Sequence, residues 1–458
     1  MTNRTAVILV VGLNQSLLKH APRLSAYAAK CQVRRLVPPL PAVTCTAQSS
    51  MVTGRPPSAH GVVANGWFNR DQAEVQFWKQ SNRLVQGDKV WHAARKIDPA
   101  FTCATLFWWY NMYAEVDWSV TPRPIYKADG RKLPDVHTHP ADLRDRLQKE
   151  LGTFPLFKFW GPAASIESTR WIADAALRVE EWHRPTLSLV YLPHLDYPLQ
   201  KLGPDHPGIP AQVLAVDIEA GRLLDAYQRQ GVTSIIVSEY GIEPVSTPVH
   251  VNRALRQAGL CRVREEEGLE VMDAGASEAF AVADHQVAHI YIRDQKMIQR
   301  VAEICRAIPG VAIVLDKAAQ REQGLGHDRS GELVLVASPG HWFTYYYWLD
   351  DQKAPDFART VDIHRKPGYD PVELFLRPGI SKAGLAWRLM KKKMGFRTLF
   401  DVIPLDAALV RGSHGRVDLP HELSPLVIAP GLSGAASAAM PSEAVHDVIL
   451  STMFQART

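Results

Sequence analysis

Residues 6–12 read AVILVVG, an unbroken apolar run that is rich in β-branched side chains. Similar runs recur along the chain, at 186–193, 234–239, 287–292, 311–315, 332–337 and 425–429. Strands that are apolar on both faces belong inside a sheet that is covered on both sides. Helical patterns alternate with these runs, at 141–151, 212–230, 251–259 and 295–307. The alternation predicts an α/β fold that is doubly wound, with a mostly parallel central sheet and helices on both faces.

Polar side chains follow several of these runs. Asn14 comes after the first run, His194 and Asp196 follow 186–193, and Glu239 and Tyr240 end the run that starts at residue 234. In open α/β sheets, ligands bind at the carboxyl ends of the strands. These five residues are therefore expected to lie near a common site.

The composition excludes several classes of protein. The chain has 458 residues, 46% of them apolar, so it is long enough to bury a large core. A net charge of +5 is too small for the basic surface of a nucleic-acid-binding protein. The five cysteines lack C-x-x-C spacing, which argues against a disulfide framework and against a thiolate zinc site. Because no apolar run is long enough to span a membrane, we expect a soluble cytoplasmic protein.

Residues 67–185 are unusual because they carry most of the tryptophans, including the pair Trp108 and Trp109 in FWWYNMY. This segment is interpreted as an insertion or lid over the site, or equally as a second small core. Residues 1–430 are expected to form the main domain. The remaining residues, 431–458, begin with GLSGAASAAMPS and are expected to form a C-terminal tail.

The segment TCTAQSS, residues 44–50, concentrates hydroxyl groups in a short space. Pro38, Pro39 and Pro41 prevent a helix before it, and Gly54 favours the end of one, so a helix is predicted to begin near Thr44. The exposed N–H groups and the dipole of a helix N-terminus stabilise an alkoxide or a phosphoryl group. Thr44 is therefore the candidate nucleophile, and the alternative is a helix cap without chemistry.

The sequence that follows strengthens this choice. TGRPPSAHG occupies residues 53–61 and Asn65 comes soon after it. The pattern resembles the type I phosphodiesterase and nucleotide pyrophosphatase family of the alkaline phosphatase superfamily. The resemblance implies an alkaline phosphatase-like hydrolase domain over residues 1–430. It also implies that Thr44 is the nucleophile and that Asn65 binds the substrate phosphate.

The resemblance further implies a divalent metal cofactor, usually zinc. Three residues of this chain match metal-ligand positions of the family. Asp196 matches the Asp of a D-x-x-x-H motif, and His414 matches the His of a G-x-H-G motif. Glu239 occupies the position of the Asp in an S-D-H-G motif, where it is a conservative replacement. The resemblance thus implies a metal site made by Asp196, Glu239 and His414.

Three other ligand positions depart from the family. Asn14 replaces an aspartate, and Gln200 and Tyr240 replace histidines. Because a neutral amide is a poor substitute for a carboxylate at a divalent cation, one ion is better supported than two, although the number stays open. His194 and His364 are candidates for supplying a missing ligand.

His285 and His289 are four residues apart, as metal ligands on a helix often are. Because VAHIYI (287–292) has the pattern of a strand, these histidines are interpreted as packed and hydrogen-bonded side chains.

The predicted function is hydrolysis of a phosphate ester, phosphodiester or pyrophosphate bond through a metal-assisted phosphothreonine intermediate. The expected substrate is a small phosphorylated metabolite or a nucleotide, and Trp108 and Trp109 are expected to stack on its ring. Two alternatives remain open. The first is a degenerate, non-catalytic protein that binds a phosphorylated ligand or a partner protein, and the second is transfer of the phosphomutase type.

Overall fold

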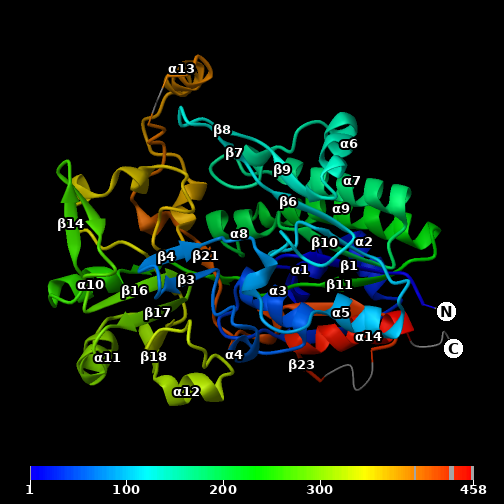
Figure 1. Ribbon diagram of the computed structural model, residues 1–458, viewed down its shortest axis with the longest axis horizontal. Coiled ribbons are helices and arrows are strands. Elements are labelled where there is room, and N and C mark those ends of the chain that lie inside the picture. The colour runs from blue at the N-terminus through cyan, green and yellow to red at the C-terminus, as the bar shows by residue number, and fades with distance from the viewer. Residues whose placement is uncertain (1, 397–398, 433–437, 455–458) are drawn as a thin grey trace.

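A nine-stranded sheet forms the centre of the molecule (Figure 1). The computed structural model describes residues 2–396, 399–432 and 438–454. Along the sheet the strand order is β23 (Met440–Pro441), β2 (Gln32–Val37), β22 (Leu426–Ala429), β11 (Thr233–Val237), β1 (Thr5–Val10), β10 (Leu187–Leu192), β5 (Cys103–Leu106), β6 (Trp118–Pro122) and β9 (Val136–His139). Five of the eight neighbouring pairs are parallel and three are antiparallel. The predicted doubly wound fold with a mostly parallel sheet is confirmed.

Helices cover both faces of this sheet (Figure 1). On one face lie α2 (Pro22–Ala28), α7 (Ile166–His183) and α9 (Ile209–Arg229), and on the other lie α3 (Thr44–Thr53), α5 (Val90–Ile97) and α14 (Val445–Phe454). Both faces of β1 and β10 are therefore buried, which explains their unbroken apolar sequences. The other helices are α1 (Gln15–Leu18), α4 (Pro57–His60), α6 (Asp142–Leu151), α8 (Asp196–Leu202), α10 (Val251–Gln257), α11 (Ile298–Arg306), α12 (Lys317–Glu322) and α13 (Lys382–Lys393).

A second lobe, seen at the left of Figure 1, is built around a four-stranded antiparallel sheet with its own hydrophobic core. Its strand order is β16 (Ala279–Asp284), β17 (Val287–Ile292), β19 (Leu333–Ala337) and β18 (Val311–Leu315). The apolar runs at 287–292, 311–315 and 332–337 were expected in the central sheet, and the structure corrects this. An apolar run shows that a strand is buried, but it does not show which sheet contains the strand.

The structure also corrects the interpretation of residues 67–185. This segment contributes β5, β6 and β9 to the central sheet, together with α5 and α7 that pack against it. Most of its buried aromatic side chains extend the first core, as Trp91, Trp108 and Trp171 do. Sequence reasoning missed these strands because they are short and are not continuous apolar runs: CATL, WSVTP and VHTH.

The C-terminal segment is part of the fold. α14 packs against β1, α3 and α5, and its Val445, Ile449 and Met453 are buried in the first core. The expectation of a C-terminal tail is therefore wrong for residues 445–454. Residues 433–437 and 455–458 lie outside the described residues. Among the described helices, none has both the length and the apolar sequence that a membrane crossing requires.

Short two-stranded pairs complete the structure. They are β3 (Gly66–Asn69) with β4 (Glu74–Phe77), β7 (Ile125–Tyr126) with β8 (Lys132–Leu133), β12 (Glu243–Pro244) with β21 (Gly412–Ser413), β13 (Thr247–Val249) with β20 (His341–Phe343), and β14 (Val263–Glu266) with β15 (Leu269–Met272). The β12–β21 pair matters for the site, because it brings the segment that carries His414 close to the end of β11.

Candidate functional site

Thr44 is the first residue of α3, as the prolines before it and Gly54 after it predict. Val43 precedes the helix in an extended conformation, and Gly54 ends it in the left-handed conformation, with φ +65. Every residue of α3 is buried, Thr44 included. The hydroxyl of Thr44 therefore lies in a desolvated place at the N-terminus of a helix.

The Thr44 hydroxyl contacts two side chains from the turn after β11. It donates a hydrogen bond to Oε1 of Glu239 over 3.1 Å, and it lies 3.2 Å from the hydroxyl of Tyr240. Gly241 follows, where a Cβ atom would lie 1.7 Å from the carbonyl oxygen of Leu423. Only glycine permits this close approach, so the turn is held in one conformation and both side chains are directed at Thr44.

Gln48 fixes the position of Glu239 from the other side. Its Nε2 donates to Oε2 of Glu239 over 2.9 Å, and its Oε1 accepts a hydrogen bond from the backbone N–H of Trp109 over 2.8 Å. Gln48 lies one helical turn after Thr44, so the two side chains share a face of α3. Both carboxylate oxygens of Glu239 thus have protein partners.

Asp196 forms the next link of the network. The hydroxyl of Tyr240 donates to Oδ1 of Asp196 over 3.1 Å, and Nε2 of Gln200 donates to Oδ2 over 2.8 Å. The hydroxyl of Tyr369 donates to Oε1 of Gln200 over 2.9 Å. Hydrogen bonds, together with the 3.2 Å contact between the Thr44 and Tyr240 hydroxyls, therefore connect Gln48, Glu239, Thr44, Tyr240 and Asp196.

Asn65 supports the start of α3. Its Oδ1 accepts from the backbone N–H of Cys45 over 2.9 Å, and its own backbone N–H and Nδ2 donate to the two oxygens of Asp284 over 2.8 and 3.1 Å. Asp284 also accepts from Nδ1 of His285 over 2.7 Å. The amide is thus held next to Thr44, and its second Nδ2 hydrogen is left for a ligand.

Four aromatic rings form one stack beside Asp196. Tyr240 stacks on His414 with ring centroids 3.6 Å apart, His414 lies 3.7 Å from His285, and His285 lies 3.6 Å from Tyr369. Nδ1 of His414 donates to the carbonyl oxygen of Ala42 over 2.8 Å. Nε2 of His285 and Nε2 of His414 are buried and have no hydrogen-bond partner, so both are acceptors that a bound donor would satisfy.

Burial controls the protonation states of the site. Desolvation raises the pKa of Glu239 to about 8 and that of Asp196 to about 7. It raises the pKa of Asp284 to about 6, and it lowers the pKa of His285 and of His414 well below the usual value. At neutral pH the imidazoles are therefore uncharged, and Glu239 retains a proton for much of the time.

The predicted metal-ligand set does not fit this site. His414 Nε2 lies 3.7 Å from Oδ1 of Asp196, but Tyr240 lies between Asp196 and Thr44, and Glu239 is held by Gln48. Within residues 2–396, 399–432 and 438–454, no group of three or more His, Cys, Asp or Glu side chains is placed to hold a metal ion. Neutral donors take the carboxylate oxygens of Asp196 and Glu239 in this arrangement, and a metal centre at Asp196, Glu239 and His414 stays a prediction.

The candidate supplementary ligands lie outside the network. Asn14 caps α1, where its Oδ1 accepts from the N–H of Leu17 and from the hydroxyl of Ser16. His194 pairs with Gln212 over 2.9 Å, and His364 pairs with the carbonyl oxygen of Phe77 over 3.3 Å. Each has a local structural partner, and none has a hydrogen bond or ion pair with Thr44, Glu239 or Asp196.

The two tryptophans have different surroundings. Trp108 is buried within the first core, so it does not face a ligand. Trp109 is partly exposed, its backbone binds Gln48, and its ring lies 5.0 Å from that of Trp78. Trp109 is therefore the better candidate for contact with a substrate.

Sequence reasoning missed Gln48, Asp284 and Tyr369, and it did not expect an unpartnered nitrogen on His285. The i, i+4 relation of Gln48 to Thr44 was a usable signal, whereas no pattern in KPGYDP marks Tyr369. His289 is packed as expected, since its Nδ1 accepts from the N–H of Gly331 and its Nε2 bonds to the carbonyl oxygen of Val63.

Comparisons with known proteins identify the family and the fold. The family described as Type I phosphodiesterase / nucleotide pyrophosphatase matches residues 5–370. An uncharacterized pyrophosphatase/phosphodiesterase of Schizosaccharomyces pombe is 24% identical over 233 residues, which is 49% of this chain and 41% of that protein. The match thus spans less than half the length of that relative.

Two solved structures share the fold over nearly the whole chain. Murine ectonucleotide pyrophosphatase/phosphodiesterase 5, in complex with AMP, is 15% identical with a TM-score of 0.59, covering 98% of this chain and 94% of that one. Phosphonoacetate hydrolase from Sinorhizobium meliloti, in complex with phosphonoformate, is 15% identical with a TM-score of 0.62, covering 98% and 96%. At this identity the likeness establishes the fold alone.

Proposed function

Because the chain belongs to the type I phosphodiesterase / nucleotide pyrophosphatase family, we propose that it hydrolyses a phosphate ester, phosphodiester or pyrophosphate, with Thr44 as the nucleophile. One observation carries the proposal: the Thr44 hydroxyl lies at a helix N-terminus and donates to a buried carboxylate, Glu239. A hydroxyl becomes a competent nucleophile when a base within hydrogen-bond reach takes its proton. A base acts best when its pKa lies near the working pH, and Glu239 meets both conditions.

The first step transfers the phosphoryl group to the protein. Oγ of Thr44 forms a bond to phosphorus while the bond from phosphorus to the leaving oxygen breaks. The hydroxyl proton passes to Glu239, and the leaving oxygen, on the opposite side of phosphorus, takes a proton from solvent. The N–H groups at the start of α3 and the free Nδ2 hydrogen of Asn65 stabilise the charge that builds on the non-bridging oxygens.

The second step regenerates Thr44. The oxygen of a water molecule bonds to phosphorus on the side opposite Oγ and gives up a proton to solvent, while the bond between phosphorus and Oγ breaks. Thr44 then recovers a proton from Glu239, so both side chains end the cycle in the protonation states in which they began it. The unpartnered Nε2 atoms of His285 and His414 are neutral acceptors, suited to orienting a water in this buried place.

A small phosphorylated metabolite or a nucleotide is the proposed substrate. The structural relative from mouse binds AMP, and in this chain Trp109 lies next to Gln48 with its ring partly exposed. An aromatic ring so placed favours a leaving group with a base or another flat ring.

The neutral residues in the network also favour a second candidate, a protein that binds a phosphorylated ligand without turnover. Gln48, Gln200 and Tyr240 satisfy the carboxylates internally, as a purely structural network would. Turnover of bis(p-nitrophenyl) phosphate that depends on Thr44 separates the two candidates. Release of free phosphate or of a free phosphate monoester separates hydrolysis from phosphomutase-type transfer, in which the phosphoryl group returns to the substrate.

Removing the hydroxyl of Tyr240 is expected to weaken catalysis. Tyr240→Phe keeps the ring stack on His414 but loses the hydrogen bond to Asp196 and the polar contact with Thr44. We expect kcat/KM to fall about tenfold, since such a bond contributes about 1–2 kcal/mol. The matched control is Tyr345→Phe, which removes another buried hydroxyl that has no partner. Equal losses in both variants would refute a specific role for Tyr240.

Metal content is a separate prediction. Members of this family generally depend on divalent metals, but here neutral donors take the carboxylate oxygens. We expect elemental analysis to find less than one divalent ion per chain, and kcat/KM to survive dialysis against a chelator. Two ions per chain, with activity that chelation abolishes and zinc restores, would contradict this account of the donor set.

A further inference from the structure

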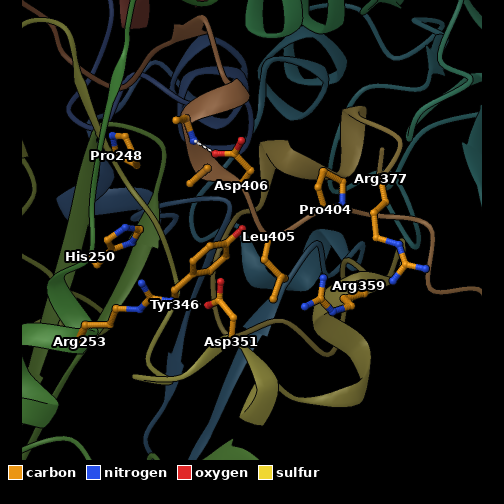
Figure 2. A pocket seen from close by; sticks show the side chains of 12 residues that line it. Pro248, His250, Arg253, Tyr346, Asp351, Arg359, Arg377, Pro404, Leu405 and Asp406 are labelled. Atoms are coloured by element: carbon orange, nitrogen blue, oxygen red, sulfur yellow. Dashed lines mark hydrogen bonds and ion pairs between the residues drawn. The ribbon is translucent and has the colours of Figure 1, made fainter. Parts of the chain in front are cut away.

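The second lobe contains a cavity of about 520 Å³ that shares no lining residue with the Thr44 network (Figure 2). Its wall comes from segments far apart in the sequence: the start of α10, the segment after β20, and the stretch from residue 351 to 408. Arg253 and His250 approach from one side, and Arg359 and Arg377 from the other. The cavity therefore joins several basic side chains around one space.

Three arginines and two aspartates line this cavity, and two of the arginines have ion pairs, Arg253 with Asp351 and Arg377 with Asp401. Arg253 donates to Asp351 over 2.9 Å and to the carbonyl oxygen of Trp348 over 2.7 Å, so both members of that ion pair are engaged. Asp406 accepts from the N–H of Ala408 over 3.1 Å and caps a short helix. Arg359, in contrast, has no ion pair or side-chain hydrogen bond with any described residue, although it lines the cavity.

A buried hydroxyl is also unsatisfied in the same wall. Tyr346 is only 1% exposed, and its hydroxyl has no hydrogen-bond partner within the described residues. Its ring is stacked on the ring of His250 at 5.8 Å, and the guanidinium of Arg253 lies 5.7 Å from it. An unpaired buried hydroxyl is costly, and a ligand that accepts its hydrogen bond removes that cost.

The rest of the wall is apolar. Pro248, Pro404 and Leu405 line the cavity, and in Figure 2 Leu405 is seen between Tyr346 and Arg359. Small-molecule sites commonly combine an apolar lining with a few polar groups that fix the orientation of the ligand. The lining of this cavity is more charged than that, because three arginines, two aspartates and a histidine contribute to it, but its volume lies within the usual range for such sites.

We propose that this cavity binds a small organic anion with a phosphoryl or carboxylate group. Arg359 pairs with the anionic oxygens, and the hydroxyl of Tyr346 donates to one of them. Pro248, Pro404 and Leu405 contact the organic part. Arg253 adds positive charge to the cavity and keeps its ion pair with Asp351.

Isothermal titration calorimetry on full-length protein tests the proposal, with inorganic pyrophosphate and citrate as the two probes. The titrations use the Thr44→Ala background, so that pyrophosphate is not consumed. Tighter binding of pyrophosphate assigns the phosphoryl class, and tighter binding of citrate assigns the carboxylate class. Arg359→Gln is expected to weaken the preferred probe at least about tenfold, as loss of a charge-assisted hydrogen bond does. Tyr346→Phe is expected to weaken it about threefold to tenfold.

Arg300→Gln is the matched control, because it removes the same charge from an exposed position on α11. It is expected to change the affinity less than twofold. The proposal is overturned if neither probe binds saturably at millimolar concentration. It is also overturned if the Arg359→Gln and Arg300→Gln variants bind the probe equally tightly. That result would place the probe elsewhere on the protein, including at the Thr44 site. Because every titration lacks the Thr44 hydroxyl, failure here leaves the proposed hydrolysis unaffected.

Discussion

Thr44→Ala is expected to lower kcat/KM for bis(p-nitrophenyl) phosphate by about 10⁴-fold or more. The alanine removes the hydroxyl that donates to Oε1 of Glu239, and loss of a nucleophile commonly removes most of an enzyme's rate enhancement. Initial rates over a range of substrate concentrations give the comparison. The fall should be in kcat, because the helix N-terminus and Asn65 remain in place to bind the substrate.

Thr46→Ala provides the control for this experiment. Thr46 lies two residues further along α3, is fully buried, and has a hydroxyl without a partner. Its loss is expected to change kcat/KM by less than about threefold. Comparable losses in the two variants would mean that damage to α3, and not loss of the nucleophile, explains the effect.

Glu239→Gln is the second change with a large expected effect. Glutamine preserves the shape and the contact with Gln48 but cannot accept the proton of Thr44, so kcat/KM should fall by about 10²–10⁴-fold. In the unmodified protein kcat/KM should rise with pH and level off above pH about 8, where Glu239 has lost its proton. The pH–rate profile of the variant should lose this rise. A variant that keeps both the rate and the profile would show that another group takes the proton.

The same substitution has a consequence for stability. Folding raises the pKa of Glu239 from 4.5 to about 8, so the folded state binds the proton more tightly than the unfolded chain does. The resulting stabilisation is complete below pH 4.5 and is lost as pH rises towards 8, a loss of about 3–5 kcal/mol. Thermal unfolding should therefore show Glu239→Gln gaining stability relative to the unmodified protein between pH 5 and pH 9. A constant difference across that range would contradict the raised pKa.

The central sheet was largely predictable because its strands are buried on both faces. Continuous apolar sequence such as 6–12 is a direct consequence of that environment, and the helical periodicity between such runs follows from one-sided burial. The same reasoning failed for 287–292 and 332–337, which pair with each other in the second sheet. Burial determines which residues are apolar, whereas partner choice depends on contacts between residues far apart in the chain.

The site was predictable where its geometry is local. Thr44 could be located because prolines and Gly54 define the ends of one short helix. The hydrogen-bond partners of Asp196 could not be predicted, because they depend on how Tyr240 and Gln200 reach it in the folded chain. Substitution of a histidine shows that a ligand is lost, but it does not show that a hydroxyl or an amide fills its place. Likewise, Tyr369 contacts Gln200 across 169 residues of sequence.

The central claim is that Thr44 attacks phosphorus and that side chains, with Glu239 first among them, handle its proton. Acid quenching of chelator-treated protein during turnover of bis(p-nitrophenyl) phosphate, followed by peptide mass spectrometry, tests this claim most directly. The account predicts a phosphorylated ester on Thr44, absent from Thr44→Ala and increased in amount when quenching is early. Product formation without any modification of Thr44, or modification that appears only after a divalent metal is added, would contradict it.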